Sequence, residues 1–127
     1  MPLTRVVLRL SRNPDAGYPG GDDDRGYVIK APLDDDGRFD AELWKKHRKD
    51  CTVERFSPDQ DEEADGWLTH RGSKWYFHWD EEDEGPDDAA FRLGEHTLRL
   101  GDYITVHNEA EDEDLVYKVT ETTRLKG

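Results

Sequence analysis

Apolar and polar residues alternate over several short stretches of this chain of 127 residues. Over Leu3–Arg12, the residues Val6, Leu8 and Leu10 take every second position, which is the period of a β-strand with one buried face. Similar stretches, bounded by glycine, proline or aspartate, predict further strands at Gly26–Leu33, Thr52–Phe56, Trp67–Asp80 (as a hairpin), Ala90–Leu93, Tyr103–His107 and Leu115–Thr120.

The hairpin expected within Trp67–Asp80 has the clearest register. Gly72 and Ser73 suit the two-residue loop of a type II′ turn, which pairs position 71 with 74 and 67 with 78. One face of the hairpin then carries Leu68, Trp75 and Phe77, with His70 and Trp79 at its ends, and the other face carries Trp67, Thr69, Tyr76 and His78.

A second hairpin is expected to join the last two strands across an acidic loop. Its register is predicted from apolar cross-strand pairs, with Val106 opposite Tyr117 and Ile104 opposite Val119.

One short helix is predicted, beginning at Asp40 and running for about ten residues. Asp40 is a good N-cap, and Phe39 before it can contact Trp44 in a hydrophobic staple. The basic run Lys45–Lys49 suits the negative end of the helix dipole.

Six or seven short strands with turn residues between them and one helix indicate a mainly β, antiparallel fold. We expect a small, partly open barrel with the helix over one end, and a sandwich is the alternative. Neither a repeat nor a linker divides the sequence, so residues 1–127 are expected to form a single domain.

The composition at first favours disorder. Leu, Ile, Val and Phe number 24 of 127 residues, and the net charge is −13. However, 23 of the 31 carboxylates lie in six stretches: Asp22–Asp24, Asp34–Asp36, Asp59–Asp65, Asp80–Glu84, Asp87–Asp88 and Glu109–Asp114. The rest of the chain is mildly basic and carries all the aromatic residues, which predicts a folded body with acidic loops.

The single cysteine, the lack of a secretory start and the lack of a long apolar run predict a cytoplasmic protein with no contact to a membrane. The chain has no phosphate-binding Gly-x-x-x-x-Gly-Lys, no His-Glu-x-x-His and no Gly-x-Ser-x-Gly motif. We therefore expect no cofactor and no catalytic residues.

Metal sites are disfavoured by spacing. Asp61, Glu63, Asp65 and Gly66 match the first positions of a calcium loop, but Gly72 stands where a bidentate Glu is required. Two histidines of the first hairpin, His70 and His78, are expected on opposite faces and so cannot share a metal ion. His107 is expected to face outward like His78, at an unknown distance from it.

Two features near the helix have a functional and a structural interpretation. Cys51 follows the basic run, whose charge lowers a thiol pKa while the helix C-terminus raises it. A partly buried, unreactive residue is favoured.

The basic run Lys45–Lys49 and the neighbouring Trp44 suit contacts with phosphates and bases of a nucleic acid, but the acidic stretches repel a polyanion. We expect these bases to pair with the acidic loops and expect no nucleic acid partner.

The candidate binding residues are Trp67, Tyr76 and His78, on the face of the hairpin directed away from the core. Large aromatic side chains on an outer face are typical of a binding surface. The alternative is that the helix or the loop over Asn13–Arg25 covers them.

Several segments resemble a family of small uncharacterised proteins from alphaproteobacteria: Gly26–Asp34, Gly37–Asp40, Trp44, Cys51–Phe56, Gly66–Leu68, Trp75–His78 and Leu100–Val106. The resemblance extends over nearly the whole chain. It implies a bacterial, cytosolic source and a stand-alone domain, and it implies no activity, cofactor or site residue.

The sequence thus favours a non-enzymatic binding or accessory module whose acidic loops and aromatic face contact a basic protein. The alternatives are a barrel that binds a small molecule or an enzyme with an unfamiliar site, and an acidic surface that serves solubility alone. A flat surface would favour the first interpretation and a deep apolar pocket the second.

Overall fold

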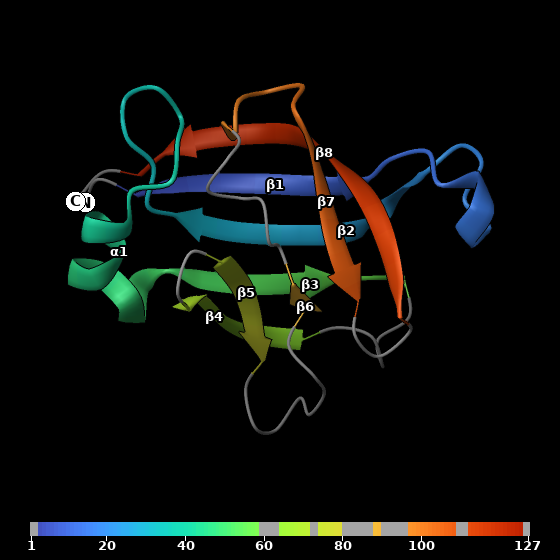
Figure 1. The fold of residues 1–127 in the computed structure, drawn as a ribbon. Helices are drawn as coiled ribbons and strands as arrows, with labels where there is room; N and C mark the ends of the chain where they lie inside the picture. The colour runs from blue at the N-terminus through green and yellow to red at the C-terminus, as the bar shows by residue number, and fades with distance from the viewer. Residues whose placement is uncertain are drawn as a thin grey trace.

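The computed structural model describes residues 3–58, 64–71, 74–79, 88–89, 97–108 and 112–125. These residues form a mainly β fold (Figure 1). The elements, in chain order, are β1 Thr4–Leu10, the 3-10 turn η1 Pro14–Ala16, β2 Asp22–Ala31, α1 Ala41–His47, the 3-10 turn η2 Arg48–Asp50, β3 Thr52–Phe56, β4 Ala64–Arg71, β5 Lys74–Trp79, β6 Asp88–Ala89, β7 Tyr103–Asn108 and β8 Glu113–Arg124.

The described strands follow one another around a barrel in chain order, each antiparallel to the next, and β8 returns to pair with β1. Seven of them are at least five residues long and form a curled sheet in the shape of half a barrel. The two-residue β6 completes the ring, because it pairs with β5 at two positions and with β7 at one. The mainly β, antiparallel barrel with one short helix is therefore confirmed. The opening expected in it is bridged by the short β6, and the continuous ring replaces the sandwich alternative.

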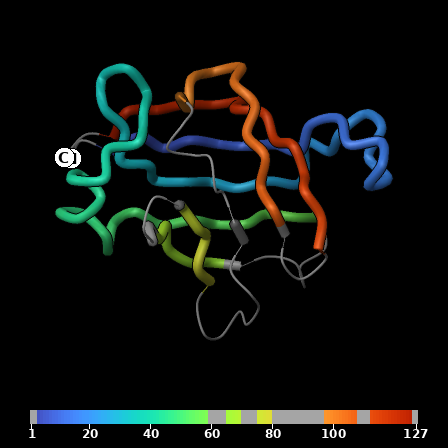
Figure 2. Tube along the Cα trace, in the orientation of Figure 1, coloured from blue at the N-terminus to red at the C-terminus, as the bar shows by residue number. Residues whose placement is uncertain are grey.

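The two described ends of the chain lie side by side at one end of the sheet (Figure 2). The backbone N–H of Leu125 donates to the carbonyl of Leu3 over 2.9 Å. The short helix α1 lies at this same end (Figure 1), as the sequence predicts.

The core consists of the inward-facing residues of the strands. Val6, Leu8 and Leu10 of β1 are buried, as are Tyr27 and Ile29 of β2. The inward positions predicted for both segments are therefore confirmed, and Val7 between two of them is buried as well. Inside the barrel the ring of Tyr27 lies 4.9 Å from that of Phe77 and 5.0 Å from that of Tyr117, in tilted and edge-on geometries that favour aromatic pairs.

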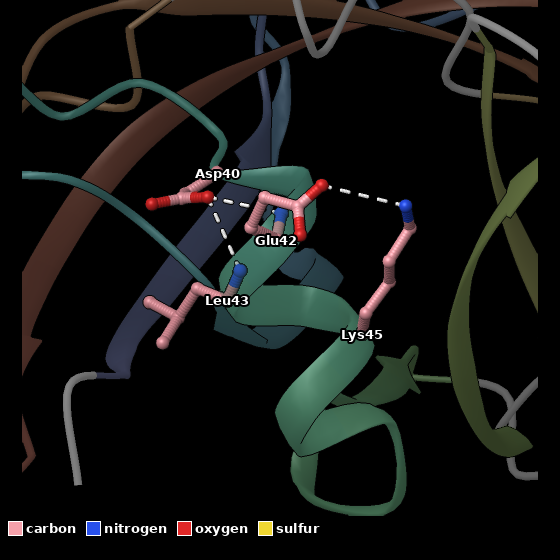
Figure 3. A network of polar contacts seen from close by, with 4 residues as sticks. All are labelled: Asp40, Glu42, Leu43 and Lys45. Carbon is pink, nitrogen blue, oxygen red and sulfur yellow. Dashed lines mark hydrogen bonds and ion pairs between the residues drawn. The ribbon is translucent and has the colours of Figure 1, made fainter.

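The helix begins where its N-cap is predicted. One carboxylate oxygen of Asp40 accepts from the backbone N–H groups of Glu42 and Leu43, at 3.0 and 3.1 Å (Figure 3). These bonds satisfy two donors that have no partner within the helix. η2 continues the helix to give the ten residues expected.

The helix is held on the barrel by Trp44, which is buried. Its indole N–H donates to the carbonyl of Leu68 over 2.8 Å. The rings of Phe39 and Trp44 lie 5.0 and 5.8 Å from that of Trp75 on β5. The apolar contact expected at the start of the helix is thus made through Trp75.

The register of the β4–β5 hairpin is confirmed, with Trp67 opposite His78 and Arg71 opposite Lys74. Gly72 and Ser73 lie outside the described residues, so the turn type stays a prediction.

The predicted register of the last hairpin is wrong by two residues. Val106 pairs with Leu115 and Ile104 with Tyr117, because the strands extend to Asn108 opposite Glu113 and leave a shorter loop than expected. A shift of two residues preserves the inward face, since side chains alternate with a period of two.

Two strand boundaries also differ from the prediction. β2 begins at Asp22, four residues early, because the pairing is irregular between Arg9 and Leu10: residues 23–25 of β2 are extra, and Leu10 pairs with Asp22. The strand expected at Ala90–Leu93 lies outside the described residues, and the segment that pairs with β5 is Asp88–Ala89.

Candidate functional site

The outer face of the β4–β5 hairpin presents the three residues singled out from the sequence. Trp67 has 41% of its surface exposed, which is unusual for tryptophan in a monomer, and His78 directly opposite it is exposed. Tyr76 is half-buried and lies opposite Thr69. Neither the helix nor the loop after β1 covers Trp67, so the alternative of a covered face is wrong for this residue.

Two exposed carboxylates lie beside Trp67 on the same outer face. Asp65 precedes Trp67 by two positions on β4, and Glu54 of β3 pairs directly with Asp65. Side chains in directly opposed positions of an antiparallel pair are about 5 Å apart at Cβ. We call Glu54, Asp65, Trp67, Tyr76 and His78 the Trp67 face.

The strand order gathers acidic residues at the end of the barrel opposite α1. Four strands begin at this end, because alternate strands of an antiparallel barrel run in the same direction. Each of the four has acidic residues at its start: Asp22–Asp24 at β2, Asp65 at β4, Asp88 at β6 and Asp112–Asp114 at β8. These residues, called the acidic end below, belong to four of the six acidic stretches of the sequence.

The ion pairs that the structure describes for the basic run at the helix are local. Lys45 Nζ lies 3.4 Å from a carboxylate oxygen of Glu42, and His47 Nδ1 lies 3.9 Å from one of Asp50, both within the same segment. Residues 59–63, 80–87 and 109–111 of the acidic loops lie outside the described part of the chain, so the pairing expected with these loops stays a prediction.

Trp44 cannot stack on a base. It is buried, and the guanidinium of Arg48 lies over its ring, 5.1 Å from the centroid. The one aromatic candidate for base stacking beside the basic run is therefore part of the core.

Cys51 is a buried structural residue. Its side chain is fully buried, and burial together with the negative charge of Asp50 raises the pKa of its thiol to about 12. A thiol with that pKa is protonated at neutral pH and is a poor nucleophile. This confirms the unreactive interpretation of Cys51.

Histidine and carboxylate side chains form no metal-binding group among the described residues. Asp65 and Gly66 of the possible calcium loop lie in β4, paired with β3, and Asp61 and Glu63 lie outside the described part of the chain. His107 faces two carboxylates, with Nδ1 2.8 Å from Asp114 and Nε2 3.6 Å from Asp112.

Aromatic side chains pack against one another inside the described part of the barrel. The ring of Trp79 stacks on that of Tyr27 at 6.1 Å, and Arg55 lies 4.9 Å from the Trp79 centroid. The indole N–H of Trp79 is buried and has no hydrogen-bond partner in the described structure.

Two hollows are present on the surface of the described part. One, of about 330 Å³, lies at the acidic end beside Asn13, whose side chain is fully engaged with the backbone of Ser11 and Val116. The other, of about 490 Å³, lies at the helix end between Asp34, Leu43 and Leu125. Sequence analysis missed this second hollow, because its residues come from three separate segments whose patterns carry no common signal.

No described helix is long and apolar enough to cross a membrane. Comparison of the chain with protein-family models, curated proteins and solved structures gave no match.

Proposed function

We propose that this protein is a binding module that captures a basic segment of another protein on the Trp67 face, beside the acidic end. The observation that carries the proposal is the exposed ring of Trp67, with Asp65 and Glu54 on the same outer face. Buried tryptophan is part of an ordinary core, whereas an exposed tryptophan next to carboxylates has the composition of an interaction surface.

The chemistry of these residues suits a lysine or arginine side chain. The face of an indole ring attracts a cation by about 0.5–1 kcal/mol at an exposed site. Carboxylates at the edge of the ring add charge pairing, and the acidic end, a cluster of like charges, accelerates the approach of a basic partner. The resemblance noted in the sequence adds the expectation of a bacterial, cytosolic partner.

The proposal is tested with a short lysine-rich peptide, titrated at low salt and followed by NMR of the four indole N–H groups. The Trp67 signal is expected to shift, while the signals of the buried Trp44, Trp75 and Trp79 stay in place. Because tryptophan is a typical hot-spot residue, Trp67→Ala is expected to weaken binding about tenfold.

Tyr103→Ala is the matched control. Tyr103 is also an exposed aromatic residue, 55% accessible, but it lies on β7 opposite Lys118, whose ammonium group lies 5.9 Å from the centroid of its ring. Its removal is expected to leave peptide affinity unchanged. Equal losses in the two variants, or peptide binding that leaves the Trp67 signal unmoved, would contradict the proposal.

A further inference from the structure

The hollow at the helix end has an apolar wall. Leu33, which is buried, and Leu43 and Leu125, which are half-buried, line it from the segment after β2, from α1 and from the end of β8. Such a wall suits the methylene groups of a long side chain, which are stabilised on apolar surface while a charged head stays near water.

Carboxylates fixed in direction form the other part of the lining. One oxygen of Asp40 accepts the two N-cap hydrogen bonds of α1, and one oxygen of Asp34 accepts from the backbone N–H groups of Asp36 and Arg38, at 2.9 and 3.0 Å. Among the described residues, no donor bonds to the second oxygen of either carboxylate. Figure 3 shows the second oxygen of Asp40 on the same side of α1 as the side chain of Leu43.

Among the described residues that line the hollow, Arg124 is the one base, and it already binds a carboxylate. Arg124 Nη2 lies 3.0 Å from Oδ1 of Asp35, and both side chains are largely exposed. An exposed ion pair of this kind contributes little stability and exchanges readily. Among the described lining residues, three carboxylates stand against one guanidinium, so this lining carries a negative charge.

We propose that this hollow holds one lysine or arginine side chain of a protein partner. The leucines contact its methylene groups, Asp34 and Asp40 bind its cationic head, and Asp35 exchanges its bond with Arg124 for one with the incoming cation. This site is separate from the Trp67 face and its existence does not depend on binding there.

The test uses n-butylammonium and n-butylguanidinium, which reproduce the cationic group and the methylene chain of lysine and arginine. The neutral analogue is n-butanol. Binding is followed by NMR of the methyl groups of Leu43 and Leu125. We expect both cations to shift these signals at concentrations where n-butanol does not, and expect high salt to weaken the effect.

Charge-removing variants that preserve the local structure sharpen the test. Asn is as good an N-cap as Asp, so Asp40→Asn is expected to leave α1 intact. Asp34→Asn likewise retains an oxygen acceptor for its two backbone donors. Each is expected to weaken cation binding about two- to fivefold, and Arg124→Ala is expected to strengthen it by a similar factor.

Asp24→Asn is the matched control, because it removes the same charge from an exposed residue at the acidic end. Equal weakening by Asp24→Asn, equal shifts with n-butanol, or weaker binding in Arg124→Ala overturns the proposal. It is also overturned if Lys126→Ala, without any added cation, shifts the Leu43 signals as the cations do, since Lys126 of this chain is then the occupant.

Discussion

Two buried tryptophans differ in what their indole N–H groups contact. That of Trp44 donates to the carbonyl of Leu68 over 2.8 Å, whereas that of Trp79 has no partner in the described structure. Replacing Trp44 with Phe removes a hydrogen bond and leaves a carbonyl short of a donor, at a cost of about 1–3 kcal/mol in addition to lost packing. Replacing Trp79 with Phe loses packing only and removes an unsatisfied donor.

We therefore expect Trp44→Phe to lower the free energy of unfolding by about 1 kcal/mol more than Trp79→Phe, measured by urea denaturation. The two variants are matched in chemistry, since each exchanges the same side chains at a buried position. A Trp79→Phe variant as damaging as Trp44→Phe would show that the Trp79 N–H has a hydrogen-bond partner in solution.

Trp67, Tyr76 and His78 could be identified from the sequence because successive side chains of a β-strand point to opposite faces. The outward direction of Trp67 follows from its position opposite His78, once Gly72 and Ser73 fix the hairpin. Its acidic neighbours were not predictable in the same way. Glu54 meets Asp65 through the β3–β4 register, and no short turn motif in Asp59–Asp65 determines that register.

Among the elements, the β4–β5 hairpin offers a direct test of its two faces. Trp75 is 2% exposed and packs against Phe39 and Trp44, while Tyr76 on the opposite face is half-buried. Trp75→Ala is expected to cost about 3–5 kcal/mol, which leaves a small domain barely folded.

Tyr76→Ala is expected to cost about 1 kcal/mol or less and to leave the domain folded. Circular dichroism and thermal melting of the two variants measure the difference. Equal damage would mean that both faces are buried in solution, and the Trp67 face would then lose part of its apolar contact area.

The two hairpins also show which element features a sequence determines. Gly72 and Ser73 leave one sensible register, and the β4–β5 prediction is correct at every pair. The acidic loop before β8 has no glycine or proline, and the backbone turns at Asp112, whose φ of 49° is rare outside glycine. Apolar pairing alone could not distinguish registers two residues apart, because both bury the same face.

The strand β6 is too short to be predicted from a pattern of apolar and polar residues. Two residues, Asp88 and Ala89, are too few to show an alternation, yet they join β5 to β7. The helix, by contrast, was predictable from Asp40, because N-cap chemistry depends on local contacts only.

For the whole molecule, the separation of charge is a consequence of topology. Each β-strand that begins at the end opposite α1 starts with acidic residues, so stretches far apart in the sequence combine into one acidic end. Like charges face each other even within the sheet, where Glu54 is directly opposite Asp65. Such an arrangement costs stability and raises the rate of encounter with a basic partner.

This charge distribution predicts that salt stabilises the fold. At a net charge of −13 the folded chain repels itself, and the repulsion is screened when the Debye length falls from about 30 Å at 0.01 M salt to a few ångströms near 1 M. The described ion pairs that salt would weaken, such as Arg9 with Glu121 at 3.2 Å, are exposed or half-buried and lie near the surface, where such pairs contribute little.

We therefore expect the melting temperature to rise by several degrees between low and high sodium chloride. Scanning calorimetry at both concentrations measures the shift, and sodium chloride is preferred to sulfate, which stabilises proteins by exclusion from the surface. Replacing Asp22, Asp23 and Asp24 with Asn should reduce the slope, since it removes like charges from the acidic end. A melting temperature that falls with salt would instead show that local ion pairs outweigh the net repulsion, and the acidic end would then be a balanced surface rather than one poised to attract a basic partner.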